Sequence, residues 1–245
     1  MVSVCMATYN GERFIRPQVE SILSQLEEND ELIISDDGST DSTLEIIKSF
    51  NDKRIKVFTH EKPAYLSEIK YNRSYYYATS NFENALLHAS GDYIFLSDQD
   101  DIWAPNKKER MISYLKKNEA DCVMCNFSLI DSEKNILTEK GFIKNPVKKS
   151  LIGKIIKSRF VGSSMCFSKE LLEKVLPFPK KLRAHDLWIG CLAKRIVFLD
   201  EPLTLYRRHE ENVSTGLEKS SNSFMYKISY RLRFFTQILT SKKGK

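Results

Sequence analysis

The order of apolar segments near the amino terminus constrains the fold more than any other feature. Residues 2–7 form a short β-type apolar run, and residues 31–35 and 55–58 form two more. Between them, residues 14–26 and 42–50 carry apolar side chains at helical spacing. Strands joined through helices lie parallel in one sheet, with the helices on its faces. The sequence therefore predicts an α/β fold with a Rossmann-like, mostly parallel central sheet.

The same patterns extend this fold along the chain. A strand at 92–96 follows a helix at 81–89, and Gly91 is expected to end that helix as a carboxyl-terminal cap. Residues 61–79 are polar and basic and are predicted to form a long connection. Further predicted elements are helices at 107–118 and 186–194, a helix starting at 168, strands at 122–130, 159–167 and 196–199, and a hairpin turn at 131–135.

Length and charge indicate one domain with a small appendage. The chain has 245 residues, with 38 Lys and Arg against 32 Asp and Glu, which gives a net charge of +6. From Lys219 onward there are cations and no acids. The rest of the chain is close to neutral, which disfavours a general nucleic-acid binder. We therefore expect a main domain at 1–217 and a basic tail at 218–245.

The cysteines and the absence of a long apolar run bear on location. The five cysteines are scattered and odd in number, so they indicate no disulfide framework and a reducing compartment. Cys122 and Cys125 form a CxxC, but they fall in a predicted buried strand and no second CxxC completes a zinc site. The sequence shows no signal peptide and no apolar run near the roughly 18 residues of a membrane-spanning helix. We expect a cytoplasmic protein with core thiols.

Two acidic turns follow predicted parallel strands. Asp98, Asp100 and Asp101 lie at the end of one strand, and Asp36 and Asp37 at the end of another. Carboxyl ends of parallel strands face one edge of a sheet, where α/β active sites usually lie. Carboxylates this close repel one another unless a cation neutralises them, and Mg²⁺ or Mn²⁺ prefers oxygen ligands. A solvated turn that caps the next helix explains the same spacing, so both interpretations stay open on the residues alone.

Five motifs occur along the chain in a fixed order. They are VCMATYNG at 4–11, ISDDGSTD at 34–41, GDYIFLSDQDD at 91–101, AHDLW at 184–188 and LYRRH at 205–209. Together they resemble the family 2 glycosyltransferases, inverting enzymes of GT-A fold, over residues 2 to about 214. The SDQDD and HDLW forms are most similar to the branch that includes bacterial rhamnosyltransferases. The resemblance implies a nucleotide-binding part at about 1–103, an acceptor-binding part at about 104–217 with a small antiparallel sheet, and a carboxyl-terminal helical tail.

The resemblance assigns the chemistry to a few side chains. Asp186 matches the catalytic base, and Asp100 and His209 match ligands of a Mn²⁺ or Mg²⁺ ion that bridges the donor diphosphate. Asp98 is expected to contact the ribose, and Asp101 to support the cluster from behind. The residue types fit, because a carboxylate can take the acceptor's proton and a cation offsets the charge of the leaving diphosphate. On residues alone, Asp186 also fits a helix N-cap, and a lone histidine such as His209 is more often structural.

The resemblance also outlines a nucleotide-sugar site. Tyr9 is expected to stack near the pyrimidine base, and Asp37 to accept from the base N3–H. Some relatives have Thr at the position of Ala7, where this chain lacks that hydroxyl. Trp188 fits a sugar pocket or a core position equally well. The implied nucleotide-sugar-binding residues are Ala7, Tyr9, Glu12, Asp36, Asp37, Asn81, Asp98, Gln99 and Trp188.

The resemblance implies a transferase that moves a sugar from a nucleotide diphosphate donor to a glycan or lipid-linked oligosaccharide in cell-surface polysaccharide synthesis. We expect dTDP-rhamnose as the donor, with a UDP-hexose second. A non-catalytic nucleotide-sugar or carbohydrate-binding module on the same fold is the alternative, which the intact acidic set disfavours. A nucleotidyltransferase or phosphatase would need a phosphate-binding lysine loop or a phosphorylatable Asp motif, and the sequence has neither.

The tail carries a separate hypothesis. Residues 223–239 interleave aromatic and aliphatic side chains with Lys227, Arg231 and Arg233, which is typical of a cationic amphipathic helix. Such a helix can lie on the anionic inner leaflet of a membrane and bring the enzyme to a lipid-linked acceptor. The alternative is a helix that packs on the body or on a partner chain.

Overall fold

The computed structural model describes residues 1–210 and 224–241. Its strands are β1 (Val2–Thr8), β2 (Glu31–Asp36), β3 (Ile55–Thr59), β4 (Tyr93–Asp98), β5 (Ile102–Trp103), β6 (Cys122–Ile130), β7 (Ile136–Thr138), β8 (Met165–Ser168) and β9 (Ile196–Arg207). Its helices are α1 (Ile15–Leu23), α2 (Thr43–Ser49), α3 (Arg73–Leu87), α4 (Lys107–Lys117), α5 (Leu151–Lys157), α6 (Lys169–Val175), α7 (His185–Leu192) and α8 (Phe224–Ser241), with short 3₁₀ turns at Ala64–Leu66 and Gly162–Ser164.

The strands form one mixed sheet in the order β3-β2-β1-β4-β8-β6-β9-β5, with β7 paired to β6. Strands β3, β2, β1 and β4 are parallel neighbours, as the βαβαβ pattern predicts. Strand β8 runs antiparallel between β4 and β6, and β9 runs parallel to β6. The antiparallel strands expected on the acceptor side therefore belong to the main sheet.

The register of three strands sets the position of the acidic turns. Thr8 at the end of β1 pairs with Asp36 at the end of β2, and Ala7 pairs with Asp98 at the end of β4. The turns that follow these strands consequently leave the sheet at one edge and at one level.

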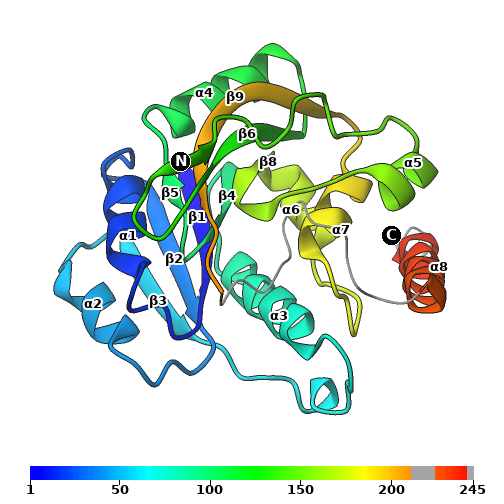
Figure 1. The fold of residues 1–245 in the computed structure, drawn as a ribbon, viewed down its shortest axis with the longest axis horizontal. Coiled ribbons are helices and arrows are strands. Elements are labelled where there is room, and N and C mark those ends of the chain that lie inside the picture. The colour runs from blue at the N-terminus through cyan, green and yellow to red at the C-terminus, as the bar shows by residue number, and fades with distance from the viewer. Residues whose placement is uncertain (211–223, 242–245) are drawn as a thin grey trace.

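Helices cover both faces of the sheet (Figure 1). Val4 and Met6 of β1 pack in the core cluster that contains Ile15 of α1, Ile47 of α2 and Met111 of α4. The alternate residue of β1, Cys5, faces the other core cluster, which contains side chains of α3, α6, α7 and α8. This alternation follows from the two-residue period of a strand.

The carboxyl-terminal helix α8 packs on the body beside α5 and α7 (Figure 1). Phe234 and Ile238 on its inner face are fully buried, and the Phe234 ring meets the Trp188 ring edge-on. This confirms the packed alternative for residues 224–241. The predicted boundary at residue 217 lies outside the described residues. Within 1–210 and 224–241, no helix has the length and apolar character needed to cross a membrane.

Three local predictions are corrected. Helix α3 begins at Arg73, so the predicted connection at 61–79 ends in two helical turns; Asn72 in the left-handed conformation starts them and Tyr76 is buried. Gly91 is not the cap of α3, which is His88. A Cβ at Gly91 would lie 2.7 Å from the Ser3 nitrogen, so close approach of two backbones explains this glycine. The predicted strand at 159–167 begins only at Met165, after a 3₁₀ turn.

The prediction of core thiols is confirmed. Cys122 and Cys125 lie in β6 and are fully buried, and all five cysteines are free thiols. Burial raises the pKa of both thiols, which makes them poor nucleophiles. The CxxC is therefore part of the core.

Replacing Phe234 with alanine tests the docking of α8. We expect the free energy of unfolding to fall by about 3–5 kcal/mol, because a fully buried aromatic side chain leaves a cavity. Leu232→Ala is the matched control, since Leu232 lies two residues away and is 62% exposed; its loss is expected to stay within about 0.5 kcal/mol. Urea denaturation measures both variants, and equal losses would contradict the docking.

Candidate functional site

A cavity of about 970 Å³ opens at the carboxyl edge of β1, β2 and β4. Its walls come from the acidic turns, from helix α3 and from the loop before α7. Most of the predicted site residues line it, although they lie as far apart in the chain as Ala7 and His209. The predicted residues that line it are Ala7, Tyr9, Asp37, Asn81, Asp98, Gln99, Asp100, Asp186 and His209.

One end of the cavity is built around Asp37. Its carboxylate Oδ1 lies 2.6 Å from His60 Nδ1, and its Oδ2 lies 3.2 Å from Lys62 Nζ. The Lys62 ammonium also lies 4.9 Å from the centre of the Tyr9 ring, over its face. Sequence reasoning missed His60 and Lys62, because nothing in the basic stretch after β3 distinguishes them from its other cations.

Two of the predicted residues brace this end from outside the cavity. Asp36 is buried and accepts hydrogen bonds from Thr8 Oγ1 at 2.9 Å and Ser39 Oγ at 2.6 Å. This closes a turn in which Gly38 has a φ of 83°, a conformation that favours glycine. Glu12 is exposed and accepts from the Ser42 backbone N–H at 2.9 Å. Both residues hold the turn after β2, as a supporting role requires.

Gln99 holds the loop that carries Tyr9. Its Oε1 accepts from the Tyr9 backbone N–H at 2.9 Å, and its Nε2 donates to the Tyr9 carbonyl at 3.0 Å. Gly11 belongs to the same contact, since a Cβ there would lie 2.4 Å from Gln99 Oε1. Both ends of the Gln99 amide therefore bind protein backbone, so this side chain positions Tyr9.

A buried lysine acts on the charges of the acidic cluster. Lys107 is fully buried, and its ammonium donates to the Ser163 carbonyl at 2.7 Å and to Thr204 Oγ1 at 2.8 Å. Burial, followed by the charge of Asp100, raises the pKa of Asp98 to about 7 and that of Asp101 well above its usual range. The charge of Lys107 acts in the opposite direction on Asp98. The sequence pointed to Lys107 only as the start of a helix.

Asp100 and His209 meet across the cavity mouth. The distance from Asp100 Oδ2 to His209 Nε2 is 2.8 Å, although the two residues are 109 positions apart. A carboxylate and an imidazole suit Mn²⁺ or Mg²⁺ as two ligands, with water and phosphate oxygens supplying the others. Among the described residues, no group of three or more His, Cys, Asp or Glu side chains is placed to hold a metal by itself. The pair therefore fits an ion shared with a bound diphosphate.

Asp186 lines the same cavity, from the first turn of α7. The N-cap of α7 is Ala184, which removes the capping explanation for this carboxylate. Loss of hydration raises the pKa of Asp186 to about 6, while the Arg183 guanidinium acts to lower it. The charge of Asp186 in turn contributes to the raised pKa of Asp98, so the two carboxylates share one electrostatic environment.

The structure corrects the prediction for Trp188. This side chain is 1% exposed, and its indole N–H donates to the Val175 carbonyl at 3.0 Å. The ring packs against Phe234 and does not line the cavity. An indole with a satisfied N–H is a stable core residue, and Trp188 supports the helix that carries Asp186.

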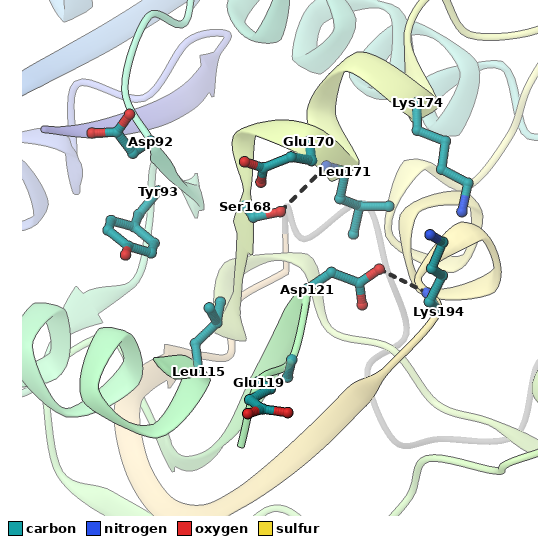
Figure 2. A pocket seen from close by; sticks show the side chains of 11 residues that line it. Asp92, Tyr93, Leu115, Glu119, Asp121, Ser168, Glu170, Leu171, Lys174 and Lys194 are labelled. Atoms are coloured by element: carbon teal, nitrogen blue, oxygen red, sulfur yellow. Dashed lines mark hydrogen bonds between the residues drawn. The ribbon is translucent and has the colours of Figure 1, made fainter. Parts of the chain in front are cut away.

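A second, smaller cavity of about 460 Å³ lies at the opposite ends of the strands, between the starts of β4 and β6 and the end of β8 (Figure 2). Of its four acidic residues, Asp121 already accepts from the Lys194 and Arg195 backbone N–H groups at 2.8 and 2.9 Å. None of the predicted site residues lines this cavity. The larger cavity is therefore the candidate active site.

The chain belongs to glycosyl transferase family 2, whose sequence profile matches residues 3–176. Two Escherichia coli proteins, WfgD and WfaP, are each 31% identical to it, and both are named UDP-Glc:alpha-D-GlcNAc-diphosphoundecaprenol beta-1,3-glucosyltransferases. The match covers 78% of this chain and 70% of WfgD, and 88% of this chain and 80% of WfaP.

Solved structures share the fold. Staphylococcus aureus TarS 1-349 in complex with UDP-GlcNAc has a TM-score of 0.64 at 17% identity, with coverage of 98% of this chain and 72% of TarS 1-349. The mannosyltransferase PcManGT from Pyrobaculum calidifontis, in complex with GDP-Man and Mn²⁺, has a TM-score of 0.61 at 20% identity, with coverage of 86% and 58%. The expected family and the GT-A fold are confirmed.

Proposed function

We propose that this chain is an inverting, metal-dependent glycosyltransferase that moves a hexose from a UDP-sugar to a hydroxyl of a lipid-linked sugar diphosphate. One observation carries the proposal. Asp37, Asp98, the Asp100–His209 pair and Asp186 all line a single cavity. This is the distribution of charge that a displacement at an anomeric carbon requires.

The choice of donor rests on relatives and on chemistry. WfgD and WfaP are named as UDP-Glc transferases, which favours the UDP-hexose expectation over dTDP-rhamnose. Asp37 suits either nucleotide, since uracil and thymine both present an N3–H. Asp98 lines the cavity and suits a hydroxyl of the nucleotide's ribose. UDP has one more such hydroxyl than dTDP. We therefore place a UDP-hexose first and keep dTDP-rhamnose as a prediction to be tested beside it.

The proton of the acceptor hydroxyl goes to Asp186. The carboxylate lines the cavity, and its Oδ1 accepts a hydrogen bond from the Leu187 backbone N–H at 2.7 Å. Removing the proton lets the hydroxyl oxygen form a bond to the anomeric carbon while the bond to the diphosphate breaks. A base on the wall opposite the leaving group implies a single displacement with inversion. Asp100 and His209 would hold Mn²⁺ or Mg²⁺, which offsets the charge of the departing diphosphate.

An acceptor that is attached to a lipid lies at a membrane surface, so the proposed function includes a contact with a membrane. The relatives' names specify a sugar attached to a lipid through a diphosphate, which favours such an acceptor here. Helix α8 buries one face and leaves Met225, Leu232 and Leu239 exposed on the other. The exposed Ile152 and Ile156 belong to the neighbouring helix α5. We assign this combined apolar surface, flanked by Arg231 and Arg233, to a peripheral contact with an anionic membrane.

A panel of nucleotides tests the donor assignment. We expect UDP or UDP-glucose with Mn²⁺ to raise the Tm more than dTDP-rhamnose or GDP-mannose does, and EDTA to reduce this rise. A ligand that binds only the native state stabilises it by about 2.7 kcal/mol when its concentration is 100 times Kd. Asp37→Asn should lose the shift. Glu119→Gln, which alters the second cavity, is the control and should keep it. No response to any nucleotide, with or without metal, would refute the enzyme proposal.

The pH dependence of transfer tests the base. Asp186 acts in its ionised form, so kcat/KM for the acceptor should fall as pH drops through about 6 and level off above it. Asp186→Asn should lower kcat by about 10²–10⁴-fold and leave UDP binding nearly unchanged. The variant also removes a charge that raises the pKa of Asp98, so any acidic limb that remains should shift to lower pH. Lost UDP binding would contradict the assignment.

Co-sedimentation with vesicles tests the membrane surface. The double change Leu232→Asp and Leu239→Asp should weaken binding to phosphatidylglycerol vesicles by about tenfold or more, since it removes two apolar side chains and adds negative charge. Leu137→Asp, at an exposed leucine of β7, is the matched control. The substitutions leave the buried face of α8 intact, unlike a deletion of the helix. Binding that does not change would refute the assignment.

A further inference from the structure

One of the three arginines that line the cavity is surrounded by aromatic rings. Arg183 lies in the loop before α7 and lines the cavity together with Tyr75 and Tyr230. Its guanidinium carbon is 4.4 Å from the Tyr75 ring centre, 5.1 Å from that of Tyr230 and 5.6 Å from that of Tyr226. The backbone of Arg183 is also fixed, because its carbonyl accepts from Thr79 Oγ1 at 2.9 Å. We call these three rings and the arginine they surround the tyrosine cage.

The charge in the tyrosine cage has no ion-pair partner within residues 1–210 and 224–241. Arg183 Nε is buried and lacks a hydrogen-bond acceptor. The rings contact the guanidinium through cation–π interactions, which do not use its N–H donors. A buried donor without an acceptor is costly, so the arrangement is that of a prepared anion site rather than of a structural salt bridge.

The donor end of the cavity and the tyrosine cage each have their own positively charged side chain, which suits two different phosphates. The donor end of the cavity is marked by Lys62, which lies over Tyr9 and Tyr77, and the metal-ligand pair is Asp100 with His209. Helix α3 places Tyr77 near Lys62 and Tyr75 near Arg183. These tyrosines are two residues apart, about 200° around the helix, so the two cations contact different faces of it. Arg183 is three residues before Asp186, and both residues line the cavity. On the proposed function, this is the side of the acceptor.

We propose that Arg183, held in the tyrosine cage, binds a phosphate oxygen of the acceptor, so that the enzyme selects a sugar that still carries its anomeric diphosphate. This inference rests on the proposed transferase function and names the group that the acceptor site recognises. With the phosphate on Arg183, the sugar ring spans the gap to Asp186 and presents a hydroxyl on its far side to the base. The planar guanidinium suits two phosphate oxygens at once, which an ammonium group does not.

Steady-state kinetics with two acceptors tests this role. One acceptor is N-acetylglucosamine linked through a diphosphate to a short lipid, and the other is the same sugar as a phosphate-free aryl glycoside. Arg183→Met should raise KM for the diphosphate acceptor about 10- to 100-fold, the range expected for a lost charge-assisted hydrogen bond. It should change KM for the aryl glycoside, and KM for the donor, less than about threefold. Arg183→Lys should restore part of the loss.

Arg159→Met is the matched control, because it removes the same charge from the same cavity and leaves the tyrosine cage intact. An equal penalty in both variants would show a general attraction of anions and would overturn the proposal. So would a rise in donor KM, which assigns Arg183 to the leaving diphosphate, or an equal loss with both acceptors, which assigns it a structural role. A wild-type protein that turns over no donor refutes the transferase function itself, which is a different result from any of these.

Discussion

The parallel pairing of β2, β1 and β4 is the constraint on which the site depends. Because Thr8 pairs with Asp36 and Ala7 with Asp98, two acidic turns leave the sheet side by side. A shift of one residue in either pairing would turn every side chain of the strand to the other face. The two core clusters on opposite faces prevent such a shift, since each contains alternate residues of β1. The geometry of the donor site is thus set by core packing.

The pKa of each carboxyl group at this edge of the sheet depends on how deeply the group is buried. Burial raises the pKa of Asp98 and of Asp101, and so disfavours their ionised forms. Lys107 is also buried, and its charge interacts with both carboxylates. A cation supplied from within the protein reduces the repulsion before any metal or substrate arrives. The cluster therefore combines a buried lysine, whose pKa is lowered by burial, with Asp100, which lines the cavity where an external cation would bind.

Sequence patterns predicted the elements whose burial follows a simple period, and they predicted β6 to the residue. The motifs brought together Asp37, Asp98, Asp100, Asp186 and His209, because each motif sits at the end of a strand or the start of a helix. Other features depend on contacts between distant segments, which no local pattern encodes. Helix α3 starts directly after Asn72, which is in the left-handed conformation, within a run of polar residues that gives no helical pattern. The roles of Lys107 and Arg183 depend on side chains and carbonyls that are distant in the sequence. Trp188 was ambiguous because an indole suits a core and a sugar site equally well.

The packing of α8 has a consequence for how this chain can be shortened. Composition changes near residue 218, which invites removal of everything beyond it. The helix that such a cut removes covers the indole of Trp188 with Phe234 and supplies Tyr226 and Tyr230 to the surroundings of Arg183. The point at which the composition changes and the point at which the folded unit ends are therefore different. A shortened chain that keeps the acidic turns would still lose Tyr230 from the lining of the cavity.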